Sequence, residues 1–335
     1  MHKTNIKKLA QELNISAATV SRALRDSYEI GIDTKQRVWD LAKEWKYEPN
    51  PFASNLRQQK SKTIAVIVPE IANHFFSIAI DGIEEIARQR GYHVLIYQTH
   101  DDNQAEIAFT ERLLSGRVDG VLISVSSHTD SNEHLIELNR NLPTVFFDRT
   151  FEQIDAMKIT TDDYESSYKA TLHLIECRCK KIVYLGGLAN LDTGKKRLMG
   201  YKDALESKNF IYDEQLVINC GKEETTKYEH IKHTLLTQKP DGILSSIEEL
   251  ALPCYYVCKD LGIRIPEDLK IISYSNLDSA ALLNPPLTTI WQPAFDIGQE
   301  AASILFKILE KKWFEPNGTR TLTSVIIERG STLTT

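Results

Sequence analysis

Long apolar runs are missing from this sequence of 335 residues. No stretch reaches the roughly 18 consecutive apolar residues of a membrane-spanning helix, which argues against a membrane partner. The basic start of the chain, residues 1–8, lacks the apolar segment that follows in a secretory signal, so we expect a cytoplasmic protein. Hydrophobic residues still make up 42% of the chain, which excludes wholesale disorder and allows two or three folding units.

Cysteine is sparse, with five residues, an odd number, and no C-x₂-C pair. Cys254 and Cys258 lie four apart on a predicted helix, where a metal pair is conceivable, but the sequence offers no third or fourth ligand. We expect reduced and partly buried thiols, and we predict neither a metal nor a cofactor.

Enzyme motifs are also lacking: there is no G-x-S-x-G, H-E-x-x-H or G-x-G-x-x-G. Residues 194–196 read Gly-Lys-Lys, without the Ser/Thr and the earlier glycine of a phosphate-binding loop. Two carboxylate pairs, Asp101-Asp102 and Asp162-Asp163, stand at predicted helix starts, where the helix dipole favours them. We interpret them as caps rather than catalytic groups, and we predict no catalytic residue.

Charge divides the chain into a basic head and an acidic body. Residues 1–60 hold 11 Lys and Arg against 7 Asp and Glu, whereas the remaining 275 residues hold 29 against 39. Because an acidic body repels DNA, only the head is expected to contact phosphate groups.

Short amphipathic helices follow one another in the head. The first has apolar residues at helical spacing, namely Ile6, Leu9, Ala10 and Leu13. Thr4 or Asn5 can cap its start, and Asn14 tolerates the left-handed conformation that ends a helix. Ser16 can cap a second helix over residues 17–25. A turn of about three residues between two helices is typical of a helix-turn-helix.

A third helix is predicted to begin near Asp33 or Thr34, with Asp33 and Gln36 spaced as in a capping box. In a helix-turn-helix the second helix enters the major groove. We predict base contacts and phosphate contacts on this basis; the base-reading candidates are Ala17, Ala18 and Arg22, and the phosphate-binding candidates are Thr19, Ser21, Arg25 and Thr34. The alternative is that the arginines are ordinary solvated charges.

A short segment with Pro49, Asn50, Ala53 and Leu56 joins head and body. It is too short for a stable helix alone, so we expect it to order against a second copy or DNA. Leu56 can then wedge into a minor-groove base step and kink the duplex. The alternative is a plain linker with Leu56 resting on the body.

The residues of this region resemble the lactose-repressor (LacI/GalR) family. The resemblance lies in the run Ile15-Ser-Ala-Ala-Thr-Val-Ser-Arg-Ala-Leu24 and in Tyr47-x-Pro-Asn-x-x-Ala-x-x-Leu56. It implies that the second helix reads an operator and that Asn50, Ala53 and Leu56 belong to a hinge helix whose leucine intercalates at the operator centre. It also implies a homodimer on a near-palindromic site.

Beyond residue 62, short apolar strands alternate with helices. The predicted strands cover 63–69, 93–97, 120–124, 144–148, 182–187, 242–245 and 269–274. Helices are predicted at 75–91, 103–115, 132–140, 164–177, 195–208, 226–237 and 248–261. The alternation predicts two doubly wound α/β lobes, with a ligand cleft at the carboxyl ends of their strands.

This body resembles the periplasmic sugar-binding fold of the same family, in which late segments cross back to the first lobe. We therefore predict a helix-turn-helix domain at 1–48, a hinge and linker at 49–62, and an effector-binding and dimerisation domain at 63–335. Its first lobe spans about 63–161 and 292–320, and its second about 162–291 and 321–335.

Strand ends and the resemblance together supply the effector-binding candidates: Phe75, Phe76, Ser124, Asp148, Arg149, Arg197, Glu248, Ser275 and Trp291. Phe75 or Phe76 matches an aromatic that stacks on the effector, although both can equally be core residues. Arg197 matches the family's R-x-x-G-Y arginine. Glu248 and Ser275 replace expected ligands, an Asn-Asp pair and an Asp, and Trp291 can add a stacking surface.

The sequence thus predicts a sequence-specific transcription regulator, a repressor of carbohydrate-related genes, controlled by a sugar or sugar derivative. Because Arg149, Arg197 and Lys195 are cationic, an acidic or phosphorylated sugar is one candidate effector. The alternatives are a sugar-modifying α/β enzyme or a solute-binding protein that carries a DNA-binding head.

Overall fold

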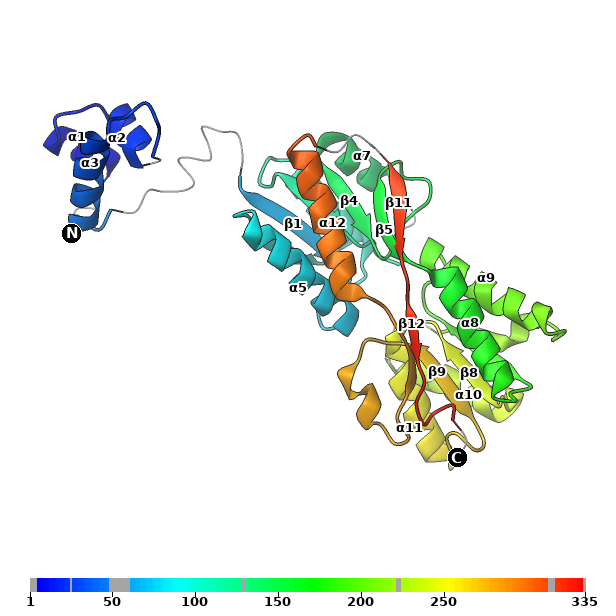
Figure 1. Cartoon of the computed structure of the whole chain (residues 1–335). Helices are drawn as coiled ribbons and strands as arrows, with labels where there is room; N and C mark the ends of the chain where they lie inside the picture. The colour runs from blue at the N-terminus through cyan, green and yellow to red at the C-terminus, as the bar shows by residue number, and fades with distance from the viewer. Residues whose placement is uncertain are drawn as a thin grey trace. The chain divides into compact units, whose positions relative to one another are not determined.

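The computed structural model of the chain describes residues 5–24, 26–47, 61–127, 131–220, 224–312 and 317–333. Its contacts divide the chain into two units, Met1–Ser61 and Lys62–Thr335, drawn in Figure 1. Among the helices in the described ranges, none has both the length and the apolar character that a membrane span needs.

Among its described residues, 5–24 and 26–47, the head unit has three helices: α1 (Ile6–Glu12), α2 (Ala17–Leu24) and α3 (Ile32–Glu44). They enclose a small core of Leu9, Ala10, Val20, Ala23, Val38 and Ala42. Asn5 caps α1 by accepting a 3.0 Å hydrogen bond from the Lys8 amide, and Ser16 caps α2 by accepting one of 3.0 Å from the Thr19 amide. Asn14 is left-handed, with φ of 52°. These three sequence predictions are confirmed.

The predicted start of the third helix is wrong by one or two residues. The helix begins at Ile32 behind Gly31, which occupies the cap position without a side-chain hydrogen bond. Asp33 therefore lies inside the first turn, where it complements the helix dipole instead of forming a capping box.

The body contains two six-stranded sheets. The first has the order β11-β5-β4-β3-β1-β2, with strands Thr63–Val68 (β1), His93–Gln98 (β2), Gly120–Ile123 (β3), Thr144–Phe147 (β4), Met157–Thr161 (β5) and Gly318–Leu322 (β11). The second has the order β12-β10-β9-β8-β6-β7, with strands Ile182–Gly186 (β6), Val217–Asn219 (β7), Gly242–Ser245 (β8), Lys270–Tyr274 (β9), Thr288–Trp291 (β10) and Val325–Ile327 (β12). Strand pairs are parallel except for β10 with β12, which confirms the predicted doubly wound class.

Helices lie between these strands along the chain. The first sheet is accompanied by α5 (His74–Gln89), α6 (Asn103–Leu113), α7 (Glu133–Asn141) and α12 (Ala294–Leu309). The second is accompanied by α8 (Asp163–Glu176), α9 (Asp192–Ser207), α10 (Glu224–Gln238) and α11 (Ala251–Leu261). The described parts of the body also contain three short 3₁₀ turns, η1 (Glu214–Leu216), η2 (Glu248–Leu250) and η3 (Asp278–Leu282). Two predicted helix starts are wrong, since α9 begins at Asp192 and the segment from Glu248 starts as the turn η2 before α11.

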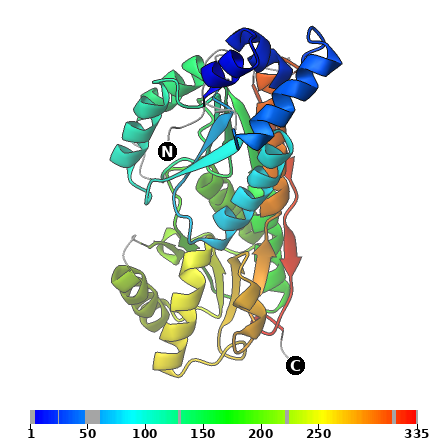
Figure 2. The ribbon, with the colours of Figure 1, turned by 90° about the vertical axis from the view of Figure 1, so that its left-hand side faces the viewer.

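The chain passes between the two sheets three times, after β5, after β10 and between β11 and β12 (Figure 2). These passages are bonded to one another. The Gln292 side-chain amide donates to Thr161 Oγ1 at 3.0 Å, and the Ser324 amide donates to Asp162 Oδ1 at 2.7 Å. The crossing strands therefore form one connected joint between the lobes.

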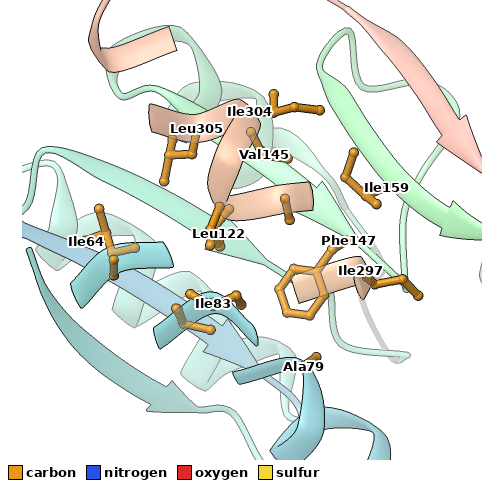
Figure 3. Packing of buried hydrophobic residues seen from close by; sticks show 14 of the residues in the cluster. Ile64, Ala79, Ile83, Leu122, Val145, Phe147, Ile159, Ile297, Ile304 and Leu305 are labelled. Carbon is orange, nitrogen blue, oxygen red and sulfur yellow. The ribbon is translucent and has the colours of Figure 1, made fainter. Parts of the chain in front are cut away.

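Apolar side chains from α5, α12 and the first sheet pack into one core (Figure 3). Close approach of the two helices depends on Gly82 and Gly298. A Cβ atom on Gly298 would lie 2.0 Å from the Ala79 carbonyl oxygen, and one on Gly82 would lie 2.2 Å from that of Phe295. This packing fixes the start of α5, and with it the strand ends that face the cleft described below.

Candidate DNA-reading helix and effector cleft

The outward face of α2 carries the predicted base-reading residues. Ala18 and Arg22 are exposed and lie four residues apart, so they share one side of the helix. Ala17 is half-buried against the head core, which leaves only part of its surface for a base contact. The Ala18 methyl can contact the methyl group of a thymine, and the Arg22 guanidinium can donate to an adjacent guanine.

Arg22 forms a surface ion pair with Glu29. Its guanidinium lies 3.1 Å from Glu29, and the two side chains are 58% and 47% exposed. Such an exposed pair is worth only about 0–1 kcal/mol, so a guanine can replace the carboxylate at small cost.

The predicted phosphate-binding residues flank this face. Thr19 is half-buried and its hydroxyl lies 2.8 Å from Ser16 Oγ, while Ser21 is half-buried on the same helix. Thr34 lies in the first turn of α3, where helix-end amides favour an anion. The remaining candidates of the head and joint, Arg25, Asn50, Ala53 and Leu56, lie outside the described residues.

A cleft of about 900 Å³ opens in the body. From the first sheet it is lined by residues that follow strand ends: Pro69, Glu70, Ala72, Asn73, His74, His100, Asp101, Ser127 and Arg149. The side of the second sheet contributes Gly187, Leu188, Cys220, Thr225, Lys227, Tyr228, Glu229, Ile247, Glu248, Glu249, Leu252, Pro253, Tyr256 and Leu277. Carboxyl ends of both sheets thus face one space, as doubly wound sheets dictate.

A smaller pocket of about 40 Å³ shares Asn73, Arg149, Leu188 and residues 247–249 with this cleft. Seven of the nine predicted effector residues line it: Phe75, Phe76, Asp148, Arg149, Arg197, Glu248 and Ser275. The structure therefore brings most of the sequence-predicted set together, and Arg149 and Glu248 belong to both spaces.

Two predicted residues lie elsewhere. Ser124 is fully buried, and its hydroxyl accepts a hydrogen bond from the Arg149 amide at 3.3 Å. Trp291 ends β10 in register with Val325 of β12 and is 37% exposed. The described residues that line the two spaces include neither of them, so a support role is proposed for Ser124 through Arg149, and the stacking role of Trp291 stays a prediction.

Arg197 is locked in the interior. It is 3% exposed, its Nε lies 2.8 Å from Asp163 Oδ1, and its Nη1 donates to the Ser246 carbonyl oxygen at 2.5 Å. Its guanidinium also lies 3.6 Å from the centre of the Tyr274 ring. Burial raises the pKa of Asp163, and Arg197 opposes that shift. The arginine therefore holds α8, α9 and the end of β8 together.

Asp148 stands at the end of β4 in the left-handed conformation, with φ of 58°. Burial raises the pKa of this carboxyl to about 6, although Arg149 and Arg197 oppose the shift. Its charge is therefore sensitive to small changes in the pocket near neutral pH.

The two phenylalanines are buried at the start of α5, with rings 5.3 Å apart in an edge-to-face arrangement. Arg149 lies 5.4 Å above the Phe76 ring and 3.1 Å from Asp101. Phe75 and Phe76 are therefore core residues, one of the two sequence interpretations, and they also form part of the wall of the smaller pocket.

The carboxylate pairs required a correction. Asp102 does cap α6, with a 2.9 Å bond from the Gln104 amide, but Asp101 lines the cleft and binds Arg149. Asp162 accepts from Ser324 rather than from its own helix, and Asp163 binds Arg197. Sequence reasoning missed Asp101, although its place after β2 marked it as a strand-end residue.

The described cysteines are all free thiols, and Cys179, Cys254 and Cys258 are buried. Cys254 Sγ lies 3.1 Å from the Leu250 carbonyl oxygen of its own helix. Within the described parts of the chain, no three histidine, cysteine or acidic side chains gather as a metal site would require.

Comparison with known proteins places both units. Residues 5–50 match the family model of bacterial regulatory proteins, lacI family, and residues 171–332 match a periplasmic binding protein-like domain. The transcriptional regulator RegA of Clostridium saccharobutylicum is 31% identical, over 98% of this chain and 99% of its own. The repressor CytR of Escherichia coli strain K12 is 32% identical, over 98% and 96%.

Solved structures agree in fold. The lac repressor dimer bound to operator and an anti-inducer has a TM-score of 0.86 at 21% identity, covering 99% of each chain. A LacI-family regulator from Enterococcus faecium with bound ribose has a TM-score of 0.67 at 29% identity, covering 80% of this chain and 98% of its own. Taken with the full-length relatives, these matches show that the chain belongs to the lacI family of bacterial regulatory proteins.

Proposed function

We propose that the protein is a sequence-specific transcription regulator whose head binds operator DNA and whose body binds a small-molecule effector. The observation that carries this proposal is the exposed face of α2, with Ala18 and Arg22 presented from a capped helix-turn-helix. Relatives of nearly equal length are named as transcriptional regulators or repressors, so repression is the effect that we expect.

The effector belongs in the cleft of about 900 Å³ and is a sugar or sugar derivative. Support comes from structures of the same fold in complex with cellobiose and with ribose. Of the proposed contacts, Glu248 lines this cleft, and Phe75, Phe76, Asp148 and Ser275 line the smaller pocket that adjoins it, where Arg149 and Arg197 hold the wall in shape. The protein acts in the cytoplasm by binding rather than catalysis.

Coupling between the two functions runs through the joint after the head. A homodimer on a near-palindromic site brings two copies of Leu56 together at the operator centre, where they wedge into the minor groove. An effector alters operator affinity only to the extent that it binds the two states of the body unequally.

The test is selection of duplexes from a random pool by the full chain, followed by footprinting. We expect a near-palindromic site with two half-sites about 10 base pairs apart. The body alone, residues 62–335, serves as the control and should select nothing. Recovery of unrelated sequences by the full chain would contradict the proposal.

A further inference from the structure

The cationic groups of the cleft are already paired with acids. Arg149 lies 3.1 Å from Asp101, and Lys227, whose side chain is only 6% exposed, lies 3.1 Å from Glu249. Arg197, the third cation among the described lining residues, is bound to its buried aspartate. An acidic effector that binds one of these cations would therefore compete with a carboxylate that already neutralises it.

Acids outnumber cations around the same space. Six carboxylates line the cleft or its inner pocket among the described residues: Glu70, Asp101, Asp148, Glu229, Glu248 and Glu249. Against three cations, this leaves three excess negative charges when histidines are neutral. A cleft with a net negative charge attracts ligands of positive charge.

Glu248 is the carboxylate best placed to contact a ligand. It lines both spaces, and its side chain is 13% exposed. Its Oε2 accepts from Ser275 Oγ at 2.9 Å and from the Asn276 amide at 2.8 Å, which fixes its direction. Its Oε1 lies 3.6 Å from the half-exposed His74 ring. Within the described residues, no lysine or arginine forms an ion pair with it.

We propose that the effector carries a protonated amine, as an amino sugar does, and that this ammonium group pairs with Glu248. The inference rests on the proposed function for the role of the cleft. An ammonium group supplies three donors and a positive charge, which complement a carboxylate whose Oε2 is held by Ser275 and Asn276 and whose Oε1 lies beside the half-exposed His74 ring. Phosphorylated sugars and uronates, suggested by the cationic residues of the sequence, are disfavoured because Arg149 and Arg197 are already paired with Asp101 and Asp163.

The experiment titrates the full chain with matched sugars and measures thermal shift and the calorimetric Kd. The probes are glucose, glucosamine, N-acetylglucosamine, glucose 6-phosphate and glucuronate, with their galacto and manno counterparts. We expect an amine to bind roughly tenfold to a hundredfold more tightly than its neutral forms, and the anions to give no shift. Glu248→Gln keeps an acceptor for Ser275 and Asn276, and it should abolish the amine preference.

Glu229→Gln is the matched control, since it removes one charge from an exposed position on the same cleft and should leave the preference intact. Binding of an anion as tight as that of the amines, no response to any amine, or equal loss of preference in both variants would each overturn the inference. Operator affinity of the same preparation, measured without sugar, tests the proposed function separately.

Discussion

Two arginines, one in each unit of the chain, show how differently the same residue type is used. Arg22 of the head is 58% exposed and forms an ion pair with Glu29 on the surface. Arg197 of the body is 3% exposed and is bound to Asp163, to the Ser246 carbonyl oxygen and to the face of Tyr274. The sequence suggested ligand contacts for both. Arg22 is exposed enough to exchange its partner, whereas Arg197 lines the inner pocket with its Nε and Nη1 already bonded.

The difference follows from what each unit has to do. A DNA-reading surface needs side chains that leave a weak partner for a base, so its contacts are exposed and weakly held. A cleft between two lobes needs a rigid wall, and a buried ion pair gives rigidity because removing either partner is strongly unfavourable. The head can therefore select a DNA sequence through its exposed side chains. The body can select an effector because buried ion pairs keep the wall of its cleft rigid.

The largest effect is expected from Arg197→Ala. Loss of this side chain leaves Asp163 buried without its cation, so the free energy of unfolding should fall by about 3–5 kcal/mol. Chemical denaturation of the body measures the change. The double variant Arg197→Met with Asp163→Leu is the control, and it should recover most of the loss. If the single variant is as stable as the parent chain, the ion pair between Arg197 and Asp163 does not stabilise the body.

Arg22→Ala should leave stability nearly unchanged and reduce discrimination at one guanine by about 1–3 kcal/mol. Fluorescence anisotropy on the selected operator and on single-base variants of it measures this loss. Lys8→Ala removes the same charge from α1 instead of α2, and it should leave the discrimination between bases unchanged. Uniform weakening on all duplexes by Arg22→Ala would assign the arginine to phosphate instead.

Asp148→Asn should stabilise the body at neutral pH by on the order of 1 kcal/mol. Burial raises the pKa of Asp148 to about 6 from an ordinary 3.8. As the pH rises from about 4 to 6, the unfolded chain therefore loses this proton before the folded chain, and stability falls. Asparagine has no charge to bury and tolerates the left-handed backbone at this position.

Melting temperatures of both proteins at about pH 4 and about pH 7.5 test this expectation, since the difference should appear only at the higher pH. A pH-independent difference would mean that Asp148 acts through packing rather than through its charge.

Glu29→Gln should have the smallest effect. It breaks the ion pair with Arg22, which changes stability by less than about 1 kcal/mol. Removal of a negative charge beside the DNA-reading face should slightly tighten binding to every duplex. The ratio of operator affinity to non-specific affinity should not change. A large gain in affinity for the operator alone would contradict this expectation. It would show that the ion pair with Glu29 restrains Arg22 more than its exposure indicates.

Helical spacing and cap chemistry predicted the head well, because its elements are local. The helix face of Leu9 and Ala10 and the caps Asn5 and Ser16 were all readable from neighbouring residues. The start of α3 was predicted wrongly because the cap residue Gly31 has no side chain that could form a capping hydrogen bond. The strand β5 was overlooked because buried Lys158 and Thr160 interrupt its apolar pattern.

The cleft was predicted only in part. Strand ends marked most of its residues, but the ion pairs that fix their roles join positions far apart in the sequence, such as Asp101 with Arg149. Trp291 was expected at the effector because it is a large aromatic near a strand end. In the structure it lies in register with Val325 of β12, an antiparallel strand that was not among the predicted strands.

The ratio of operator affinity to non-specific affinity, measured with the full chain at one fixed salt concentration, tests the central claim most directly. The account predicts that the selected operator binds at least about 10³-fold more tightly than a scrambled duplex of equal length. Equal affinity for the two duplexes would contradict it, because α2 would then contact phosphate groups without reading the bases.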